Sequence, residues 1–227
     1  MTDLDSDQEW AIQTLDEVGV VKLGHFIGTA GPHLDAYVAK DVPTRFPVRL
    51  RGLIRRINDK IGRLGDAGTV DVVVAAPMGA LAGGVMLAEE LRVEYVYLEE
   101  EGTGKDKKLV IKRAPFIEAV QGKRVGIFED IVNTGETTEA TIAAVEAAGG
   151  TVVWVACLWS RDGRTAESFG IPFFVPLVNK LLRKWADYQA CKVDGPCSQG
   201  EPVRIDFGRP EKFPELAKYP GGTIDHG

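Results

Sequence analysis

The sequence predicts an α/β protein with a mainly parallel sheet flanked by helices. Apolar runs rich in Val and Ile alternate with segments of helical periodicity over most of the chain. Strands that are apolar along their whole length are typical of parallel sheets that helices cover on both faces. The 227 residues are also enough for one substantial core with a small appended lobe.

The N-terminal part contains two predicted helices around a short strand. Residues 7–19 are expected to form a helix, because apolar side chains recur at roughly helical spacing until Gly19. A strand over residues 20–27 and a turn over residues 28–33 follow. Residues 49–64 form a basic amphipathic helix. The apolar face of that helix carries Leu50, Leu53, Ile54, Ile57 and Ile61.

Further along the chain, the alternation of strands and helices becomes regular. The predicted strands cover residues 71–76, 94–98, 124–130, 151–159 and 171–175, and the predicted helices cover residues 82–91 and 136–148. Residues 99–108 are polar and contain glycine, so a mobile loop is expected there. The C-terminal tail carries Pro, Gly and two Cys and is expected to be irregular.

Charge and composition exclude several classes of function. The net charge of −6 and the lack of a basic block argue against nucleic-acid binding. Three cysteines suggest a reducing compartment, and the acidic N-terminus is unlike a signal peptide. Residues 70–88 are apolar, but Pro77 and three glycines interrupt them, which favours a strand, a loop and a helix over a membrane span. We therefore expect a soluble cytoplasmic protein with no membrane or nucleic-acid partner.

Residues 124–138 are the most informative segment. The predicted strand ends in two carboxylates, Glu129 and Asp130, and a loop rich in Thr and Gly leads into a helix. The first turn of a helix offers unpaired N–H groups and the positive end of its dipole, which suit a phosphate. Asp130 is expected to be exposed at the strand end, where open parallel sheets bind ligands. Carboxylates beside a phosphate suit a diol or a bridging Mg²⁺, so the segment predicts a site for a ribose 5-phosphate.

Other motifs have simpler interpretations. An acidic N-cap at an ordinary strand–loop–helix junction would explain one carboxylate and one Thr of residues 124–138, but not the whole run. Residues 76–80, which follow a predicted strand, form either an anion-binding loop or a tight turn. Gly104 and Lys105 do not complete a P-loop, because position 99 is Glu and position 106 is Asp.

The segment 124–138 resembles the signature of the type I phosphoribosyltransferases. Three other stretches are similar to the orotate phosphoribosyltransferases in particular, namely residues 21–41, 162–167 and 191–202. The resemblance implies a type I phosphoribosyltransferase core with a small hood lobe. In a single domain over residues 1–227, the hood would combine residues 1–45 with part of residues 176–227, and the core would span residues 46–175.

The resemblance also implies an activity. The expected enzyme is a glycosyltransferase that moves the 5-phosphoribosyl group from phosphoribosyl pyrophosphate to a nucleobase, with Mg²⁺ as cofactor. Orotate is the expected base, which gives orotidine 5-phosphate and pyrophosphate in pyrimidine nucleotide biosynthesis. A homodimer is the expected assembly. Two alternatives stay open: a non-catalytic sensor of phosphoribosyl compounds or nucleotides on the same fold, and a phosphoribosyltransferase for another base.

Catalytic and binding roles follow from the same resemblance. Glu129 and Asp130 are expected to hold the ribose hydroxyls, and Mg²⁺ through the substrate. Lys112 and Arg113 are expected to meet the pyrophosphate, because the strand before the loop leads into acidic residues instead of a basic pair. The remaining substrate-binding candidates are Asn133, Thr134, Gly135, Glu136, Thr137 and Thr138 for the phosphate, Pro77, Met78, Gly79 and Ala80 for the pyrophosphate, Lys105 in the loop, and Lys22 and Phe26 in the N-terminal lobe.

The cysteines and histidines carry no predicted chemistry. Cys191 and Cys197 lack a second pair of ligands at the tighter spacing of structural zinc sites, so no metal is expected there. For His25, a role at the surface or in the packing of the N-terminal lobe is favoured over a catalytic role, because His often sits half-buried without chemistry. Cys157 lies in an apolar strand and is expected to be a small core residue.

Overall fold

The computed structural model describes residues 3–28, 31–102 and 108–204, and the chain divides into two compact units. The larger unit contains Met1–Thr14 and Lys40–Leu181, and the smaller unit contains Leu15–Ala39 and Leu182–Gly227. Residues 1–14 and 40–45, which the sequence assigned to the hood, group with the larger unit. A hood that caps a base remains a prediction.

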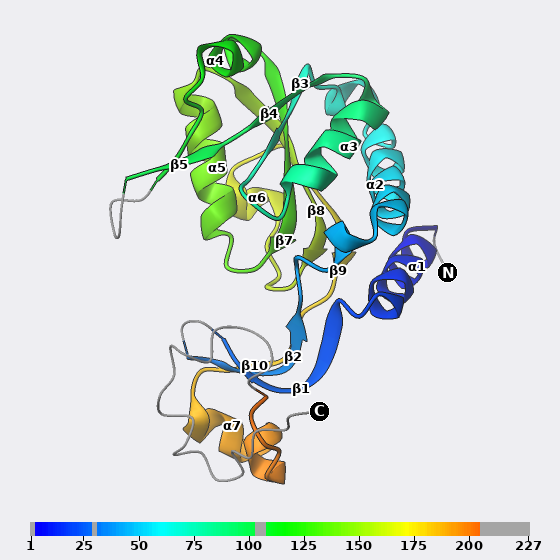
Figure 1. The fold of residues 1–227 in the computed structure, drawn as a ribbon, viewed down its shortest axis with the longest axis vertical. Coiled ribbons are helices and arrows are strands. Elements are labelled where there is room, and N and C mark those ends of the chain that lie inside the picture. The colour runs from blue at the N-terminus through cyan, green and yellow to red at the C-terminus, as the bar shows by residue number, and fades with distance from the viewer. Residues whose placement is uncertain (1–2, 29–30, 103–107, 205–227) are drawn as a thin grey trace. The chain divides into compact units, whose positions relative to one another are not determined.

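The larger unit is built on a five-stranded sheet in the order β4-β3-β7-β8-β9 (Figure 1). All four neighbouring pairs are parallel, which confirms the predicted fold class. The strands are β3 (Val72–Ala75), β4 (Glu94–Tyr97), β7 (Arg124–Val132), β8 (Thr151–Ser160) and β9 (Phe173–Asn179). Since the strands are parallel, the loops after β3, β7 and β8 emerge at one edge of the sheet.

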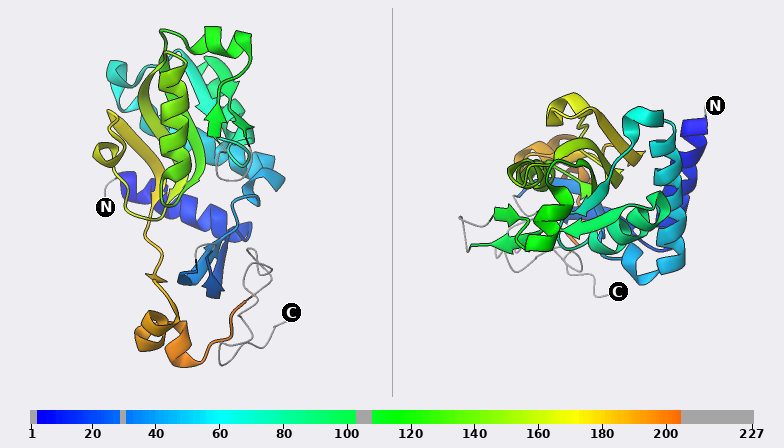
Figure 2. Two further views of the ribbon diagram at one scale, coloured as in Figure 1. Left: turned by 90° about the vertical axis from the view of Figure 1, so that its left-hand side faces the viewer. Right: turned by 90° about the horizontal axis from the view of Figure 1, so that it is seen from above.

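Helices cover both faces of this sheet (Figures 1 and 2). α2 (Pro47–Gly62) and α3 (Leu81–Leu91) lie on one face, and α4 (Ala114–Val120) and α5 (Glu136–Ala147) lie on the other. Shorter elements complete the unit, namely α1 (Asp3–Glu17), which continues into the smaller unit, η1 (Pro43–Arg45), η2 (Gly65–Gly68), α6 (Ala166–Phe169), and the antiparallel pair β5 (Glu99–Glu101) and β6 (Lys108–Val110). None of the helices in the described ranges is long and apolar enough to cross a membrane.

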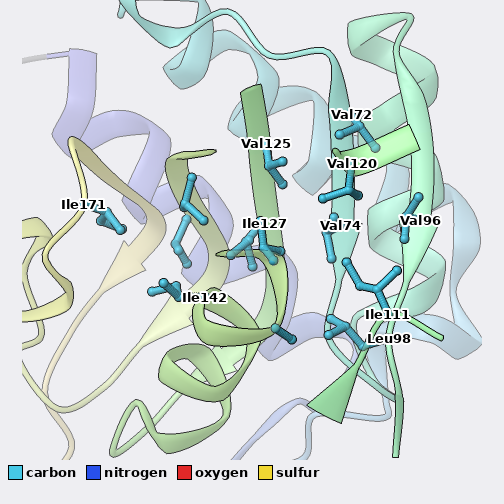
Figure 3. Packing of buried hydrophobic residues seen from close by; sticks show 14 of the residues in the cluster. Val72, Val74, Val96, Leu98, Ile111, Val120, Val125, Ile127, Ile142 and Ile171 are labelled. Carbon is cyan, nitrogen blue, oxygen red and sulfur yellow. The ribbon is translucent and has the colours of Figure 1, made fainter. Parts of the chain in front are cut away.

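The side chains of β3 and β7 alternate between the two helical layers. Val72, Val74 and Ile127 belong to a cluster on the α4 and α5 side of the sheet (Figure 3). On the opposite face, α2 buries all five apolar residues that the sequence placed on its core side. α3 packs closely there, because an added Cβ at Gly83 would lie 2.4 Å from the Phe128 ring. The continuous apolar character of the strands is therefore explained by burial on both faces.

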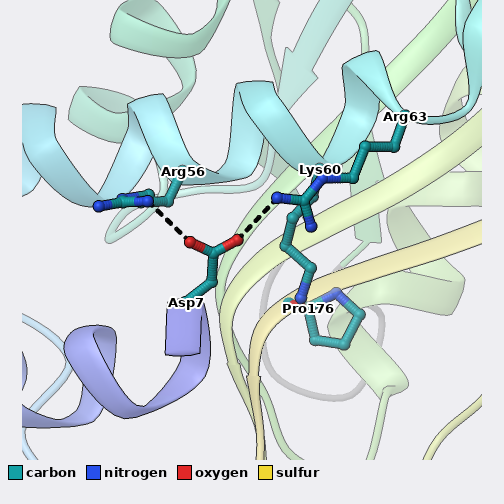
Figure 4. A network of polar contacts seen from close by, with 5 residues as sticks. All are labelled: Asp7, Arg56, Lys60, Arg63 and Pro176. Carbon is teal, nitrogen blue, oxygen red and sulfur yellow. Dashed lines mark hydrogen bonds and ion pairs between the residues drawn. The ribbon is translucent and has the colours of Figure 1, made fainter. Parts of the chain in front are cut away.

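A buried ion-pair network joins α1 to α2 within the larger unit (Figure 4). The Asp7 carboxylate, 3% exposed, lies 2.8 Å from Arg56 and 3.0 Å from Arg63. Lys60 on the same helix donates a hydrogen bond of 2.5 Å to the carbonyl of Pro176, and burial lowers the pKa of its ammonium group. Both acid oxygens are thus satisfied, as burial of a carboxylate requires.

The smaller unit contains a three-stranded antiparallel sheet in the order β1-β2-β10. Its strands are β1 (Val21–Ile27), β2 (His33–Val38) and β10 (Lys184–Trp185), followed by the helices α7 (Tyr188–Asp194) and η4 (Pro196–Gln199). The expected strand at residues 20–27 is confirmed. The expectation of an irregular tail is wrong for residues 184–199, where the Asp187 side chain caps α7.

Two further elements differ from the sequence prediction in the larger unit. β7 runs to Val132, past the predicted end at residue 130, because Ile131 and Val132 still pair with β8. Residues 99–101 and 108–110 form paired strands where one loop was expected. The expected mobility of residues 103–107 lies outside the described residues.

Candidate functional site

Glu129 and Asp130 lie inside β7 and are almost completely buried. The two residues are 5% and 4% exposed, so the expectation of an exposed Asp130 is wrong. The strand continues beyond them, and the loop after β3 covers Asp130. Burial of two adjacent carboxylates is costly unless each oxygen finds a partner.

The acid pair is incompletely satisfied by the protein. Asp130 Oδ1 accepts a hydrogen bond of 2.7 Å from the backbone N–H of Ile131. Glu129 Oε2 and Asp130 Oδ2 have no hydrogen-bond partner among the described residues. The Lys40 ammonium group lies 4.0 Å from Asp130 Oδ2, at the outer limit of an ion pair. Burial raises the pKa of Glu129 well above its ordinary value, and the negative charge of Asp130 raises it further.

The loop of residues 76–80 contacts the acid pair directly. A Cβ added at Gly79 would lie 1.8 Å from Asp130 Oδ2, so no other residue fits here without a shift of the loop. The loop contains a cis peptide bond between Pro77 and Met78, and Met78 is exposed. Ala80 is buried at the start of α3. The predicted anion-binding loop and the predicted acid pair therefore belong to one site.

The loop of residues 133–138 leads from β7 into α5 and is shaped by Gly135. This residue has φ +89°, a left-handed conformation that favours glycine, and it directly precedes the helix. A Cβ here would also lie 2.8 Å from the Phe169 ring. Asn133, Thr134, Glu136 and Thr137 are exposed at this turn, whereas Thr138 is buried. The helix start thus presents backbone N–H groups beside exposed polar side chains.

Two arginines to which the sequence analysis assigned no role contact the loop of residues 133–138. Arg161 donates a hydrogen bond of 3.0 Å to the Asn133 side chain. Arg164 donates to the Thr134 carbonyl and forms an ion pair of 3.0 Å with Glu139. Both follow β8, the strand beside β7, so their position after a neighbouring strand of a parallel sheet was the signal that could have identified them.

Lys112 and Arg113 follow β6 and precede α4, and acidic residues of β5 pair with them. Lys112 is 3.3 Å from Glu101, and Arg113 is 2.6 Å from Glu99. Both basic side chains are more than half exposed. Their contact with pyrophosphate remains a prediction, and Lys105 lies outside the described residues.

Lys22 and Phe26 lie on β1 in the smaller unit. Phe26 is 1% exposed and packs against the Tyr37 ring at 5.7 Å. This packing gives Phe26 a role in the core of its own unit. A role for either residue in binding the base remains a prediction.

A groove of about 700 Å³ lies elsewhere in the larger unit, between β6, α4 and α5. Five of its twelve lining residues are alanines, among them Ala140, Ala144 and Ala147. None of its lining residues belongs to the acid pair or to the loops of residues 76–80 and 133–138. The groove is therefore separate from the chemistry of the candidate site.

The site brings together negatively charged acceptors and positively charged donors at one edge of the sheet. The acid pair offers two buried oxygens that can accept hydrogen bonds from hydroxyls or approach a hard cation. The start of α5 and the two arginines offer donors and positive charge that suit a phosphate. Such a site fits a ligand that carries a phosphate beside a diol.

Comparisons with known proteins agree with this chemistry. The phosphoribosyl transferase domain family matches residues 46–188. The orotate phosphoribosyltransferase of Caulobacter vibrioides (strain NA1000 / CB15N) is 34% identical over 161 residues, which cover 70% of this chain and 78% of that protein. That of Caldanaerobacter subterraneus subsp. tengcongensis is 26% identical over 198 residues, which cover 87% of this chain and 95% of that protein. The crystal structure of orotate phosphoribosyltransferase from Aeropyrum pernix is similar in fold, with a TM-score of 0.60 at 20% identity over 74% of this chain and 92% of that one.

Proposed function

Because the chain belongs to the type I phosphoribosyltransferase family, we propose that it transfers the 5-phosphoribosyl group of phosphoribosyl pyrophosphate to orotate. The products are orotidine 5-phosphate and pyrophosphate. Relatives that carry the name orotate phosphoribosyltransferase, and that match most of this chain, support orotate over other bases. A cytoplasmic homodimer, which the family resemblance implies, stays a prediction.

The observation that carries the proposal is the acid pair with two buried oxygens that lack hydrogen-bond partners among the described residues. Buried polar atoms in folded proteins are nearly always hydrogen-bonded, so these oxygens point to a ligand. Glu129 and Asp130 lie at the same edge of the sheet as Gly79 and Gly135. We assign the ribose 2- and 3-hydroxyls to the two carboxylates, and the 5-phosphate to the turn at Gly135.

In the reaction, the bond between the anomeric carbon and the pyrophosphate oxygen breaks, and a ring nitrogen of the base forms the new bond. The pyrophosphate leaves with the electron pair, so positive charge grows on the sugar ring in the transition state. Glu129 and Asp130 hold the diol, and their negative charge favours that ring. The start of α5 anchors the phosphate and fixes the reactive carbon in place.

The residues also fit a magnesium ion, since carboxylate oxygens are the ligands that Mg²⁺ prefers in proteins. Glu129 and Asp130 would hold it through the hydroxyls of the substrate. When bound, Mg²⁺ would neutralise negative charge on the leaving pyrophosphate.

A second candidate function is a non-catalytic sensor of phosphoribosyl compounds. The observation that favours it is the pairing of Arg113 with Glu99 and of Lys112 with Glu101. Both cations that were assigned to the leaving group are engaged by carboxylates, which weakens their attraction for pyrophosphate. A sensor would bind phosphoribosyl pyrophosphate and release nothing.

An assay of pyrophosphate release separates these functions. Purified protein is mixed with phosphoribosyl pyrophosphate and Mg²⁺, and orotate, uracil, adenine or hypoxanthine is added in turn. We expect release with orotate, together with loss of orotate absorbance, and little release with the other bases. Release of pyrophosphate with a purine and not with orotate would show that the accepted base is a purine. Tight binding of phosphoribosyl pyrophosphate without release of pyrophosphate would support the sensor function.

A further inference from the structure

Four side chains converge in the smaller unit that the proposed reaction does not use. They are His25 of β1, His33 of β2, Cys191 of α7 and Cys197 of η4, here called the His/Cys cluster. One nitrogen or sulfur atom of each lies within 4.8 Å of the corresponding atoms of the other three. His25, His33 and Cys191 are buried, and Cys197 is partly buried. All four residues belong to the same compact unit.

The distances among His25, His33 and Cys197 can be compared with those between ligands of one tetrahedral ion. His33 Nδ1 lies 2.7 Å from His25 Nε2 and 3.3 Å from Cys197 Sγ, and Cys197 Sγ lies 3.6 Å from His25 Nε2. Zinc bonds of about 2.0 Å to nitrogen and 2.3 Å to sulfur place tetrahedral ligands roughly 3.3–3.8 Å apart. Of these three distances, the nitrogen–nitrogen distance is the one below that range, and an opening of about 0.6 Å would bring it there. The Cys191 sulfur lies within 4.8 Å of the other three ligand atoms.

A neighbouring carbonyl orients His25 for ligation. His25 Nδ1 lies 2.8 Å from the carbonyl oxygen of Glu201. A carbonyl only accepts, so Nδ1 carries the proton and Nε2 directs its lone pair toward the cluster. Metal-binding histidines are usually held by such a bond on the second nitrogen.

The backbone around the cysteines brings the second pair of ligands together. The backbone N–H of Cys197 donates a hydrogen bond of 3.3 Å to Cys191 Sγ, so the two cysteines lie side by side. Gly195 allows the turn between α7 and η4, since a Cβ there would lie 2.8 Å from Cys191 Sγ and 2.7 Å from the Trp185 ring. The two cysteines are thus held on one side of the cluster by a tight turn.

The cluster also joins two segments that are distant in sequence. His25 and His33 come from the β1–β2 hairpin, whereas the cysteines come from residues 188–199. A small lobe buries little apolar surface, and such lobes are commonly stabilised by a metal or by disulfides. The three cysteines are free thiols in the structure.

We propose that His25, His33, Cys191 and Cys197 bind one zinc ion, which stabilises the smaller unit. Two nitrogens and two sulfurs in a tetrahedral arrangement are a donor set typical of zinc. Four protein ligands leave no open position for a substrate, so the site is structural and not catalytic. The sequence did not indicate this site, because His25 and His33 lie more than a hundred residues before Cys191 and not at short spacing from it.

The test is a measurement of zinc in protein purified without a histidine tag and without chelator. We expect about one zinc per chain by plasma mass spectrometry, and less than a tenth of that in the Cys191→Ser/Cys197→Ser double variant. Cys157→Ala is the matched control, because Cys157 lies in β8 of the larger unit. The Cys157→Ala protein should contain as much zinc as the wild type. Removal of zinc from the wild type by chelator should lower Tm by more than about 5 °C.

A second variant keeps the proposal testable if the double variant does not fold. His33→Cys preserves four ligands, so it should retain about one metal per chain. In the Co²⁺-loaded protein, this variant should show stronger thiolate-to-metal absorption than the wild type and the visible bands of a tetrahedral site. Folded wild type without zinc, a Cys191–Cys197 disulfide in non-reducing peptide maps, or zinc that survives loss of both cysteines would overturn the proposal.

Discussion

At the scale of single residues, Glu129 and Asp130 occupy an electrostatically unfavourable position. Both are buried next to each other in β7, and one oxygen of each has no hydrogen-bond partner among the described residues. Burial raises the pKa of Glu129 well above its ordinary value, and the negative charge of Asp130 raises it further. Such arrangements lower stability and are retained where a ligand needs them.

Asp130→Asn is therefore expected to reduce activity without loss of stability. Asparagine can keep the hydrogen bond from Ile131 and removes one of two repelling charges. The loss of one charged hydrogen bond to the ribose, worth about 1.5–3 kcal/mol, should lower kcat/KM by roughly 10- to 150-fold. Tm should stay the same or rise.

The control for this variant is Asp66→Asn, which neutralises an exposed acid in η2, before β3 and away from the acid pair. It should leave kcat/KM unchanged. If Asp130→Asn lost folding and activity in equal measure, the residue would be structural and the assigned role would be wrong. Steady-state kinetics and differential scanning calorimetry on the same preparations give both quantities.

The sequence predicted which residues form this site better than how they lie. Glu129 and Asp130 were identified because an apolar strand ends in two acids before a Thr and Gly loop. Their burial depends on the approach of Gly79, about fifty residues earlier in the chain, which no local pattern encodes. The contact of Arg164 with the Thr134 carbonyl is likewise set by the pairing of β7 with β8.

At the scale of elements, the parallel sheet gathers the functional loops at one edge. The loops after β3, β7 and β8 all begin where parallel strands end. The strand–helix alternation predicted these elements well, since burial on both faces leaves long apolar runs. β2 and α4 were missed because both are short and lack a strong periodic pattern.

Gly135→Ala tests the turn between β7 and α5. A left-handed conformation costs an alanine about 1–2 kcal/mol, and its Cβ would collide with Phe169 as well. The displaced helix start should raise KM for phosphoribosyl pyrophosphate at least about 10-fold, because the phosphate loses backbone donors. The free energy of unfolding should fall by more than the backbone strain alone would cause, because of the collision with Phe169.

Gly122→Ala is the matched control for that change. Gly122 has φ +71° and nothing within 4 Å of an added Cβ, so only the backbone strain is introduced. Gly122 precedes β7, at the opposite edge of the sheet from the loop of residues 133–138. Urea denaturation should show a loss in free energy of unfolding close to the cost of backbone strain, and kinetics should show an unchanged KM for phosphoribosyl pyrophosphate. A raised KM in this control would mean that Gly135 is not specifically required for phosphate binding.

At the scale of the whole molecule, ligand binding should be visible as stabilisation. Phosphoribosyl pyrophosphate with Mg²⁺ satisfies the acid pair only in the folded protein, so it should raise Tm. At a concentration of 100 Kd the gain is about 2.7 kcal/mol, which corresponds to roughly 5–10 °C for a chain of this size. Omission of Mg²⁺ should reduce the shift, as should Asp130→Asn.

This experiment leaves Mg²⁺ out instead of adding a chelator, so that the proposed zinc ion of the His/Cys cluster stays in place. Dye-based thermal scans are sufficient to measure the shift. An equal shift with and without Mg²⁺ would mean that the metal does not take part in binding, and no shift at all would argue against the ribose 5-phosphate site itself.

The smaller unit is formed by residues from both ends of the chain, with the hairpin before residue 39 and the remainder after residue 182. On the ribosome, the hairpin emerges long before its partner segment. At about 5–20 residues per second, the delay before Cys197 is synthesised is on the order of 8–30 s. During that interval the nascent hairpin exposes His25 and His33 without the cysteines, so this lobe must be the last part of the protein to mature.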